Sequence, residues 1–471
     1  MKNKYTYAKK NITILVVSLL LIYGTSCNKS ELLDAKPKSN LSIPSTLQDL
    51  QVLLDAPINY TPAIDALNDN YYLSNTYLQT AIQQSVNVYT FSADIYQALG
   101  NIQDWNVPYS QIFTANVVLE TLPSIQVTST NQASWNAIKG SALFLRAWSF
   151  FNIAQLYAPV YDSATASTNL GIPLRLSPDL NEKSVRSTLS QTYDRILNDL
   201  LEARNLLNAT VPLANKNRPS LISDFALLSR IYLSIGNYNK AGLYADSSLR
   251  IYNSLVDYNT IKISTTKYFP FTNLNNAEVF FGAQQYSLTG GAMGSILNTI
   301  GNNVLAGIDS TLLKSYASND LRKSVFYFVN NGITNLNYGY DASGYVYNGL
   351  CTDELYLNRA EAFARAGSTT EAMSDLNSLL INRWKTGTFV PFVSSSSSAA
   401  LILILTERRK ELPFRGVRWL DLRRLNKEGY NISITHIFNG QTYTLAPNDI
   451  KYTYPIPPDV IQFSGIQQNL R

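Results

Sequence analysis

The sequence predicts a mostly α-helical fold in which helix pairs are interrupted by long loops and short strands. Three blocks, residues 140–157, 220–252 and 353–384, place apolar residues at the spacing of one helix face. Between the last two blocks, residues 253–350 are punctuated by glycines and carry short apolar runs that are typical of strands. With 471 residues, the chain is long enough to bury a large core.

Two of the helical blocks share a pattern that predicts paired antiparallel helices. In each, a helix ends at a glycine, and an alanine five residues later begins the seam of a second helix: Gly236 is followed by Ala241, and Gly367 by Ala372. Because small side chains let two helices approach closely, the pattern resembles the tetratricopeptide helix–turn–helix. The copies do not recur every ~34 residues. We therefore expect scattered helix pairs rather than a tandem array.

The remaining elements follow from the same apolar spacing and from turn residues. Pro123 ends one predicted helix, and Thr188 or Ser190 can cap the start of another. Residues 69–96, rich in Asn and Tyr, predict long loops with short helices. The further elements expected are helices from residue 46 onwards, over 105–122 and over 189–207, short strands at 279–282 and 324–329, and an apolar run at 399–405 that leads into a charged helix.

The first residues predict an exported, lipid-anchored protein. Four lysines precede a charge-free apolar stretch at residues 11–22, and small residues then lead to Cys27. This order is that of a secretory signal, and the apolar stretch is shorter than the ~20 residues of a spanning helix. The cysteine resembles the acylated cysteine of the bacterial lipoprotein lipobox, although Gly24 stands where an aliphatic residue is usual. The alternative is an ordinary signal peptide with a chance cysteine.

These assignments divide the chain into three parts. We expect a signal peptide over residues 1–26, a lipidated tether over 27–45 and one domain over 46–471. Within the domain, an N-terminal part extends to about residue 250 and a C-terminal part begins at about residue 251, where the composition changes.

Charge and residue counts exclude several classes of function. The formal charge of +5 includes four lysines of residues 1–26, so the remainder carries about +1 and has no general attraction to nucleic acid. Apart from Cys27, Cys351 is the only thiol, and His436 is the only histidine, which we expect to be structural or merely exposed. The sequence therefore predicts no intrachain disulfide, no His/Cys metal site, no catalytic triad and no cofactor, and phosphate-binding glycine loops are missing.

The most distinctive string is Glu407–Leu425. Residues 407–424 hold seven Arg or Lys against three acids, which allows a nucleic-acid patch, a membrane-binding amphipathic helix or internal ion pairing. The acids interleave with the bases. Internal pairing is favoured, because Glu407 can meet Lys410, and Asp421 can meet Arg418 or Arg424, one helical turn away.

This string resembles the C-terminal signature of the RagB/SusD family of Bacteroidetes, which reads roughly E-R-R-x-E-L-x-F-x-G-x-R-W-x-D-L-x-R. The residues that match its anchors are Glu407, Arg408, Arg409, Glu411, Leu412, Phe414, Gly416, Arg418, Trp419, Asp421, Leu422 and Arg424. Further matches, in chain order, are Leu33-Asp34 with Pro37, Trp105 with Tyr109, Ile112 and Asn116, Phe144–Ala147 with Tyr157 and Pro159, Arg359–Ala362, and Tyr454–Pro457 with Gln468-Asn469. Arg415 departs from the family, since many members carry an acid there.

The resemblance implies a surface nutrient-binding lipoprotein on the outer face of the outer membrane. It implies four tetratricopeptide-like helix pairs on one side and a loop-rich half that builds the ligand site. Such a protein captures an oligosaccharide, or in some members a peptide, and passes it to a SusC-like TonB-dependent transporter. It is not an enzyme.

Ligand residues are not identified by the family motifs, so we place them by chemistry. Sugars stack on exposed aromatic rings of loops and need polar groups nearby for their hydroxyls. The chain has 31 tyrosines, many of them in two insertions. The candidate ligand residues are Asp69, Asn70, Tyr71, Tyr72 and Tyr77 in the first insertion, and Tyr338, Tyr340 and Tyr345 in the second. The alternative is that these tyrosines are half-buried packing residues.

Two other functions stay open at this point. A helical-repeat scaffold that binds only proteins would use the same helix pairs. A surface glycoside hydrolase would need two carboxylates about 5–9.5 Å apart, and no acid of the chain sits in a recognisable catalytic frame.

Overall fold

A computed structural model describes residues 44–56, 59–212, 214–264, 266–271, 276–286, 292–302 and 304–471. The predicted signal peptide, Cys27 and most of the predicted tether lie outside the described residues. Thr46–Arg471 form one compact unit. Among the described residues, no helix is both long enough and apolar enough to cross a membrane.

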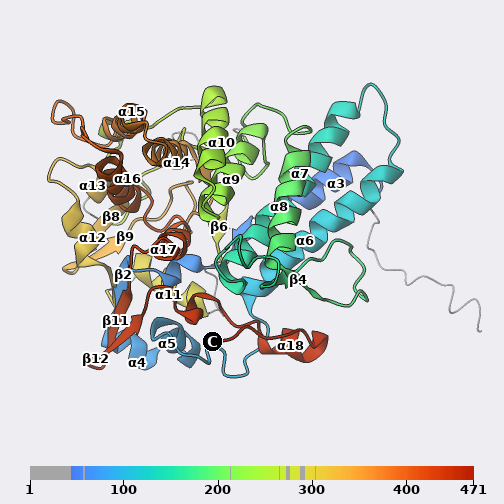
Figure 1. The fold of residues 1–471 in the computed structure, drawn as a ribbon, viewed down its shortest axis with the longest axis horizontal. Coiled ribbons are helices and arrows are strands. Elements are labelled where there is room, and N and C mark those ends of the chain that lie inside the picture. Colours follow the sequence, from blue (N-terminus) through green and yellow to red (C-terminus); the bar gives the residue numbers. More distant parts are fainter. Residues whose placement is uncertain are drawn as a thin grey trace, which may run out of the picture. The chain divides into compact units, whose positions relative to one another are not determined.

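Long helices that pack against one another form one part of this unit. They are α6 (Gln103–Thr121), α7 (Gln132–Tyr157), α8 (Leu189–Ala203), α9 (Leu221–Ser234), α10 (Tyr238–Ile251), α14 (Thr352–Arg365) and α15 (Thr369–Leu380). Contacts join α6 to α7, α7 to α8, α9 to α10, α10 to α14 and α14 to α15. Figure 1 shows this series across the upper half of the view. The mostly α-helical class predicted from the sequence is confirmed.

The two predicted glycine–alanine seams form as expected. Gly236 and Gly367 follow α9 and α14 with φ angles of 76° and 88°, in the left-handed region that glycine adopts without strain. Ala241 and Ala372, which begin the seams of α10 and α15, are fully buried. The glycine reverses the chain, and the small alanine lets the next helix lie close against the previous one.

Helix starts are set by polar side chains. Thr46, Thr188 and Ser220 each cap a helix in a capping box, in which the hydroxyl accepts from the third residue of the helix. The predicted start of α7 at residue 140 was wrong, because the helix begins eight residues earlier, at Gln132. Its first three residues, 132–134, are exposed, and the close apolar spacing on which the prediction depended begins only further along the helix.

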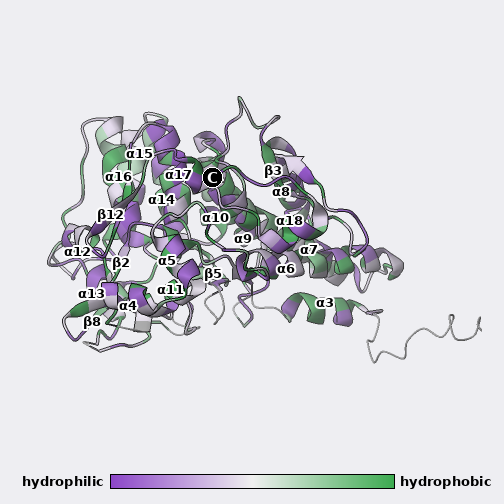
Figure 2. Ribbon diagram, turned by 90° about the horizontal axis from the view of Figure 1, so that it is seen from below, coloured by the Kyte–Doolittle hydropathy of each residue, from purple (hydrophilic) through white to green (hydrophobic). Residues whose placement is uncertain are grey.

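The other elements of the unit are further helices and two-stranded sheets. The helices are α3 (Leu47–Asp55), α4 (Asn75–Thr80), α5 (Gln83–Tyr89), α11 (Ala292–Asn302), α12 (Ser310–Ser315), α13 (Arg322–Phe326), α16 (Ser397–Glu411), α17 (Arg418–Lys427) and α18 (Pro458–Ser464), with single 3-10 turns at Ile64–Leu67, Leu122–Ser124, Tyr258–Thr260 and Ile450–Tyr452. Figure 1 places α4, α5 and α18 along the lower edge of the view. Figure 2 shows apolar stretches beside polar ones within helices such as α3 and α16.

Among the described residues the strands form six pairs, and three of these pairs join distant segments of the chain. They are β1 (Tyr60–Thr61) with β6 (Gln284–Gln285), β2 (Tyr71–Leu73) with β7 (Ala306–Ile308), β3 (Leu170–Pro173) with β4 (Arg186–Thr188), β5 (Val279–Phe281) with β10 (Leu350–Cys351), β8 (Tyr327–Asn330) with β9 (Ile333–Leu336), and β11 (Ile434–Phe438) with β12 (Gln441–Leu445). The first of these pairs is parallel and the other five are antiparallel. The pairs β1–β6 and β2–β7 therefore join residues 60–73 to residues 284–308.

One predicted strand was partly wrong. Residues 324–326 belong to the helix α13, and the strand β8 begins only at Tyr327. A short apolar run does not by itself distinguish a strand from a helix turn. Here the buried ion pairs of Arg322 hold the turn at the start of α13.

Buried ion pairs of the signature string connect these parts. Glu411 lies 3.1 Å from Arg322 and 2.7 Å from Arg383, and both guanidinium groups are fully buried. Arg322 also pairs with Glu407 at 2.6 Å, and Arg383 with Glu278 at 2.6 Å. The end of α16 is thus tied to α13, to the segment after α15 and to the start of β5.

The second half of the string continues this pattern. Asp421 of α17 pairs with Arg408 and Arg424, each at 2.8 Å. Arg424 also reaches Glu361 of α14 at 2.6 Å. The prediction that the charges pair internally is confirmed, including Glu407 with Lys410 at 2.7 Å.

Arg415, which stands where many family members carry an acid, forms an ion pair with an acid outside the string. Its guanidinium lies 3.1 Å from Asp353 and 3.8 Å from the ring centre of Tyr340. Tyr347 lies on the same guanidinium at 4.9 Å. A buried cation is thereby balanced by one carboxylate and covered by two aromatic rings.

We expect Glu411→Gln to lower the free energy of unfolding by about 3–5 kcal/mol, because it leaves part of the charge of Arg322 and Arg383 unbalanced in the core. Urea denaturation measures this change. The control is Glu371→Gln on the exposed face of α15, which should change it by less than about 0.5 kcal/mol. A loss below about 1 kcal/mol for Glu411→Gln would contradict the role given to this network.

Candidate functional site

The eight predicted ligand residues do not share one environment. Tyr71, Tyr338 and Tyr340 are buried, with exposed fractions of 3%, 5% and 8%. The Tyr71 hydroxyl donates to the Ala66 carbonyl at 2.6 Å, and the Tyr338 hydroxyl to the Leu297 carbonyl at 2.7 Å. In this structure their rings and hydroxyls are engaged in packing.

Tyr340 lies deepest in the charge network. Its hydroxyl lies 2.6 Å from a Glu278 oxygen and 2.9 Å from an Asp353 oxygen. The cavity beside Tyr338 and Tyr340 measures about 30 Å³, which holds about one water and no sugar ring.

Asp69 and Asn70 face the signature string rather than an open surface. Asp69 accepts two hydrogen bonds from Arg418, both at 2.7 Å, and pairs with Arg409 at 3.2 Å. Burial alone would raise the pKa of Asp69, but the charge of Arg418 outweighs it and lowers the pKa to about 2. Asn70 is fully buried and its oxygen accepts from Arg409 at 3.2 Å.

Three predicted tyrosines keep accessible surface. Tyr72 of β2 is 42% exposed, and Tyr77 of α4 is half-buried. Tyr345 is also half-buried and borders the same small cavity as Tyr338 and Tyr340. These three rings are the part of the predicted set that a ligand can reach in this structure.

Tyr60 and Tyr286 are two further tyrosines with accessible surface, and the set predicted from the sequence does not include them. The rings of Tyr60 and Tyr286 meet edge to face, with centres 5.3 Å apart, and both are half-buried. Burial raises the pKa of Tyr60, and the nearby hydroxyl of Tyr345 raises it further. Strand pairing of β1 with β6 brings residues 60 and 286 together, and no local sequence pattern predicts that pairing.

We call Tyr60, Tyr72, Tyr77, Tyr286 and Tyr345 the accessible tyrosine set. Each has an aromatic face beside a hydroxyl, the combination that suits a wet, sugar-like ligand. Tyr60 lies in β1, Tyr72 in β2 and Tyr77 in α4, whereas Tyr286 follows β6 and Tyr345 lies in the second insertion.

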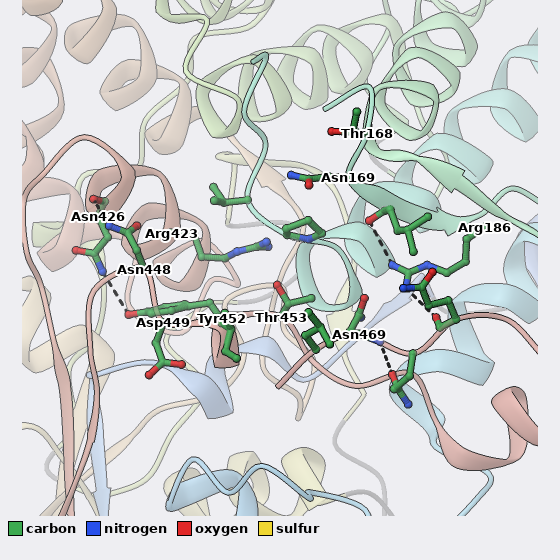
Figure 3. Close-up of a pocket in the computed structure, with 17 residues that line it drawn as sticks. Thr168, Asn169, Arg186, Arg423, Asn426, Asn448, Asp449, Tyr452, Thr453 and Asn469 are labelled. Carbon is green, nitrogen blue, oxygen red and sulfur yellow. Dashed lines mark hydrogen bonds between the residues drawn. The ribbon is translucent and has the colours of Figure 1, made fainter. Parts of the chain in front are cut away.

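Two larger cavities lie elsewhere in the described part of the chain. One, of about 740 Å³, lies between α6 and α18 and is lined by Phe113 and Phe463, which are 39% and 85% exposed. The other, of about 490 Å³, lies between the end of α7 and residues 448–470 and is shown in Figure 3. Both volumes fall in the range of small-molecule sites.

His436 has the structural role that the sequence predicts. It is 3% exposed, its Nδ1 lies 2.7 Å from the Tyr89 carbonyl, and its ring stacks on Tyr89 at 4.0 Å. Burial lowers the pKa of His436 to about 4, so the ring is neutral at pH 7. Among the described residues, no group of His, Cys, Asp and Glu is placed to hold a metal ion.

Fold and packing together define an α-rich protein of paired helices with a loop-rich half held by buried charges. Two family profiles match the sequence: one described as starch-binding and associating with the outer membrane, over residues 31–233, and one described as the SusD family, over residues 306–470. The chain belongs to the SusD/RagB family. Its members are associated with the outer membrane and are carbohydrate-binding proteins in general.

Solved structures share this fold. A SusD superfamily protein from Bacteroides thetaiotaomicron has a TM-score of 0.70 at 24% identity, over 90% of this chain and 100% of its own. A putative sugar binding protein from Bacteroides vulgatus has a TM-score of 0.69 at 20% identity, over 91% of this chain and 99% of its own. A laminarin-binding SusD-like protein has a TM-score of 0.63 at 18% identity, over 89% of this chain and 97% of its own. No curated protein matches the chain in sequence.

We expect the imidazole of His436 to titrate near pH 4 rather than near 6.5. Because the unfolded chain binds this proton more readily, stability is full above about pH 6.5 and falls by about 3 kcal/mol as the pH drops to 4. NMR of the untagged protein follows this ring directly, since the sequence holds one histidine. His436→Phe, which keeps the stacking, should remove this part of the pH dependence. A ring midpoint above pH 6 would contradict the burial argument.

Proposed function

We infer that this protein is a cell-surface binding subunit that captures oligosaccharides and passes them to a SusC-like TonB-dependent outer-membrane transporter. The observation that carries the proposal is the family match over residues 31–233 and 306–470. Carbohydrate is favoured over peptide because the matching profile is described as starch-binding and a structural neighbour as laminarin-binding.

The accessible tyrosine set is our proposed contact surface for the oligosaccharide. Tyr72 and Tyr77 would offer one pair of rings, and Tyr286 and Tyr345 another. Rings that keep an exposed face can stack on a sugar without first leaving the core. The buried Tyr71, Tyr338 and Tyr340 would act by holding the strands and loops that carry them.

A binding role without bond cleavage is supported by the state of the two acids beside Tyr340. Glu278 and Asp353 both lie within hydrogen-bond distance of the Tyr340 hydroxyl, but they are fully buried. Their charges are taken up by Arg383 and Arg415. A glycoside hydrolase needs two carboxylates that reach a bound sugar, and this pair is closed to one.

We further propose that Cys27, acylated after removal of residues 1–26, anchors the protein in the outer membrane, facing the exterior. The family description as associating with the outer membrane supports this location.

We expect the double variants Tyr72→Ala/Tyr77→Ala and Tyr286→Ala/Tyr345→Ala to weaken oligosaccharide binding at least ~10-fold, since each loses two stacking rings. Isothermal titration with laminari-oligosaccharides and malto-oligosaccharides measures this. Tyr430→Ala, which removes a ring that is 39% exposed after α17, is the matched control and should bind normally. Unchanged affinity in both double variants would refute the proposed surface. If the protein binds members of a peptide panel and no oligosaccharide, the ligand class is peptide rather than carbohydrate.

We expect Cys27→Ser to shift the protein from the outer-membrane fraction to the soluble fraction, because it removes the acylated thiol. Cell fractionation and intact-mass measurement detect the shift and the lipid. Cys351→Ser changes the other, buried thiol and should stay in the membrane. A wild-type protein without acyl chains would rule out the anchor.

A further inference from the structure

The cavity of about 490 Å³ is built from segments that are far apart in sequence. The residues that line it come from the turn after α7, from β3 and β4, from α17 and from residues 448–470. Figure 3 shows Arg423 and Arg186 reaching into it from opposite sides, with Thr453 and Asn469 between them. Its walls therefore bring two cations toward one space.

Arg423 is an exception among the buried arginines. Nine arginines of the described residues are buried, and each of the others has a carboxylate within ion-pair distance. Arg423 is 4% exposed and has none in the described part of the chain, and its Nε has no hydrogen-bond partner. Burying a cation without a counter-charge is unfavourable, so this site calls for an anion.

Backbone carbonyls balance Arg423 only in part. It donates to the carbonyls of Gln155 and, at 2.6 Å, of Ala158, where α7 ends. A helix C-terminus carries roughly half an elementary negative charge. Two of the five N–H groups of the guanidinium are engaged in this way, which leaves three, the buried Nε–H among them, without a carbonyl partner.

Arg186 brings a second uncompensated charge to the same cavity. Its nitrogens donate to the carbonyls of Gly171, Gln467 and Leu170 at 2.8, 3.0 and 3.2 Å, and no described carboxylate pairs with it. Burial lowers the pKa of Arg186 and of Arg423 to about 10, so both are charged at pH 7. Asp449, the acid among the lining residues, uses Oδ1 to accept from the N–H of Lys451.

The rest of the lining suits a sugar ring. Pro159, Val160, Leu170 and Tyr452 give an apolar wall, and Thr168, Asn169 and Asn448 bring hydroxyl and amide groups. An apolar face with a few polar groups is the usual make-up of a small-ligand site, and the volume accommodates one or two sugar units.

We propose that this cavity binds a sugar residue that carries a carboxylate, such as a uronic acid, with the carboxylate held between Arg423 and Arg186. The guanidinium fork matches a planar carboxylate in two parallel hydrogen bonds. Arg423 falls at the last unspecified position of the signature, between Leu422 and Arg424, so the signature itself does not demand it. The inference rests on the proposed carbohydrate function for its ligand class, but it uses residues separate from the accessible tyrosine set.

The test compares matched acidic and neutral sugars. Ligand-detected NMR with D-glucuronate and D-galacturonate against D-glucose and D-galactose, and isothermal titration with trigalacturonate against its methyl ester, isolate the carboxylate. We expect the wild-type protein to bind the acids at least ~10-fold more tightly than the neutral partners. Equal affinity within these pairs would overturn the proposal.

Variants then assign the preference to the two arginines. Arg186→Gln and Arg423→Gln should each reduce the preference for acids by ~10-fold or more, whereas Arg250→Gln, which removes an exposed charge elsewhere, should keep it. Arg423→Gln also removes the contacts at the end of α7, so the melting temperature of this variant is measured in parallel. If the Arg423→Gln protein is unfolded, the result for Arg186→Gln decides the test. A preference that persists in a folded Arg186→Gln protein would overturn the site.

The same variants separate this inference from the proposed function. Both arginine variants should bind neutral oligosaccharides as the wild type does, and the tyrosine double variants should keep the preference for acidic monosaccharides. Loss of neutral binding in the tyrosine variants without any acid preference in the wild type would uphold the proposed function and refute this site. If the wild-type protein prefers acidic sugars but does not bind neutral oligosaccharides, the result would uphold this site and refute the proposed function.

Discussion

A charge in a protein interior is tolerated when an opposite charge lies against it, and this constraint shapes the whole unit. Glu411 is shared by Arg322 and Arg383; Arg322 also reaches Glu407 of the same helix, and Arg383 reaches Glu278 before β5. Removing one partner leaves the others in a medium that solvates them poorly. Segments separated by more than a hundred residues are thereby obliged to meet at fixed points.

The consequence is a loop-rich half with little regular structure but well-defined positions. Its sheets have two strands each and could not stabilise themselves in isolation. Asp69, paired with Arg418, holds the first insertion against α17, and Asp353, paired with Arg415, holds the start of α14. Accessible tyrosines such as Tyr72 are therefore carried on a backbone that buried charges keep in place.

Local patterns predicted the helices well because their causes are local. The apolar stripes, the capping residue Thr188 and the glycine turns at Gly236 and Gly367 act within a few residues, and the structure has them as expected. The site was less accessible to such reasoning. Tyrosines in one insertion look alike in sequence, but the strand pairs β1–β6 and β2–β7 decide which rings are buried, and these pairs join residues more than 200 positions apart. Arg423 likewise looks like the other arginines of the string in sequence, and only the structure shows that it has no carboxylate partner among the described residues.

Arg415 has a consequence for how related chains differ. Its guanidinium is enclosed by Asp353, Tyr340 and Tyr347, so the base at 415 is the main balance for the negative charge of the acid at 353. A relative with an acid at 415 would set two like charges against each other unless position 353 also differed. The two positions are therefore expected to covary, and a chimera that exchanges the C-terminal segment between relatives must carry both or neither.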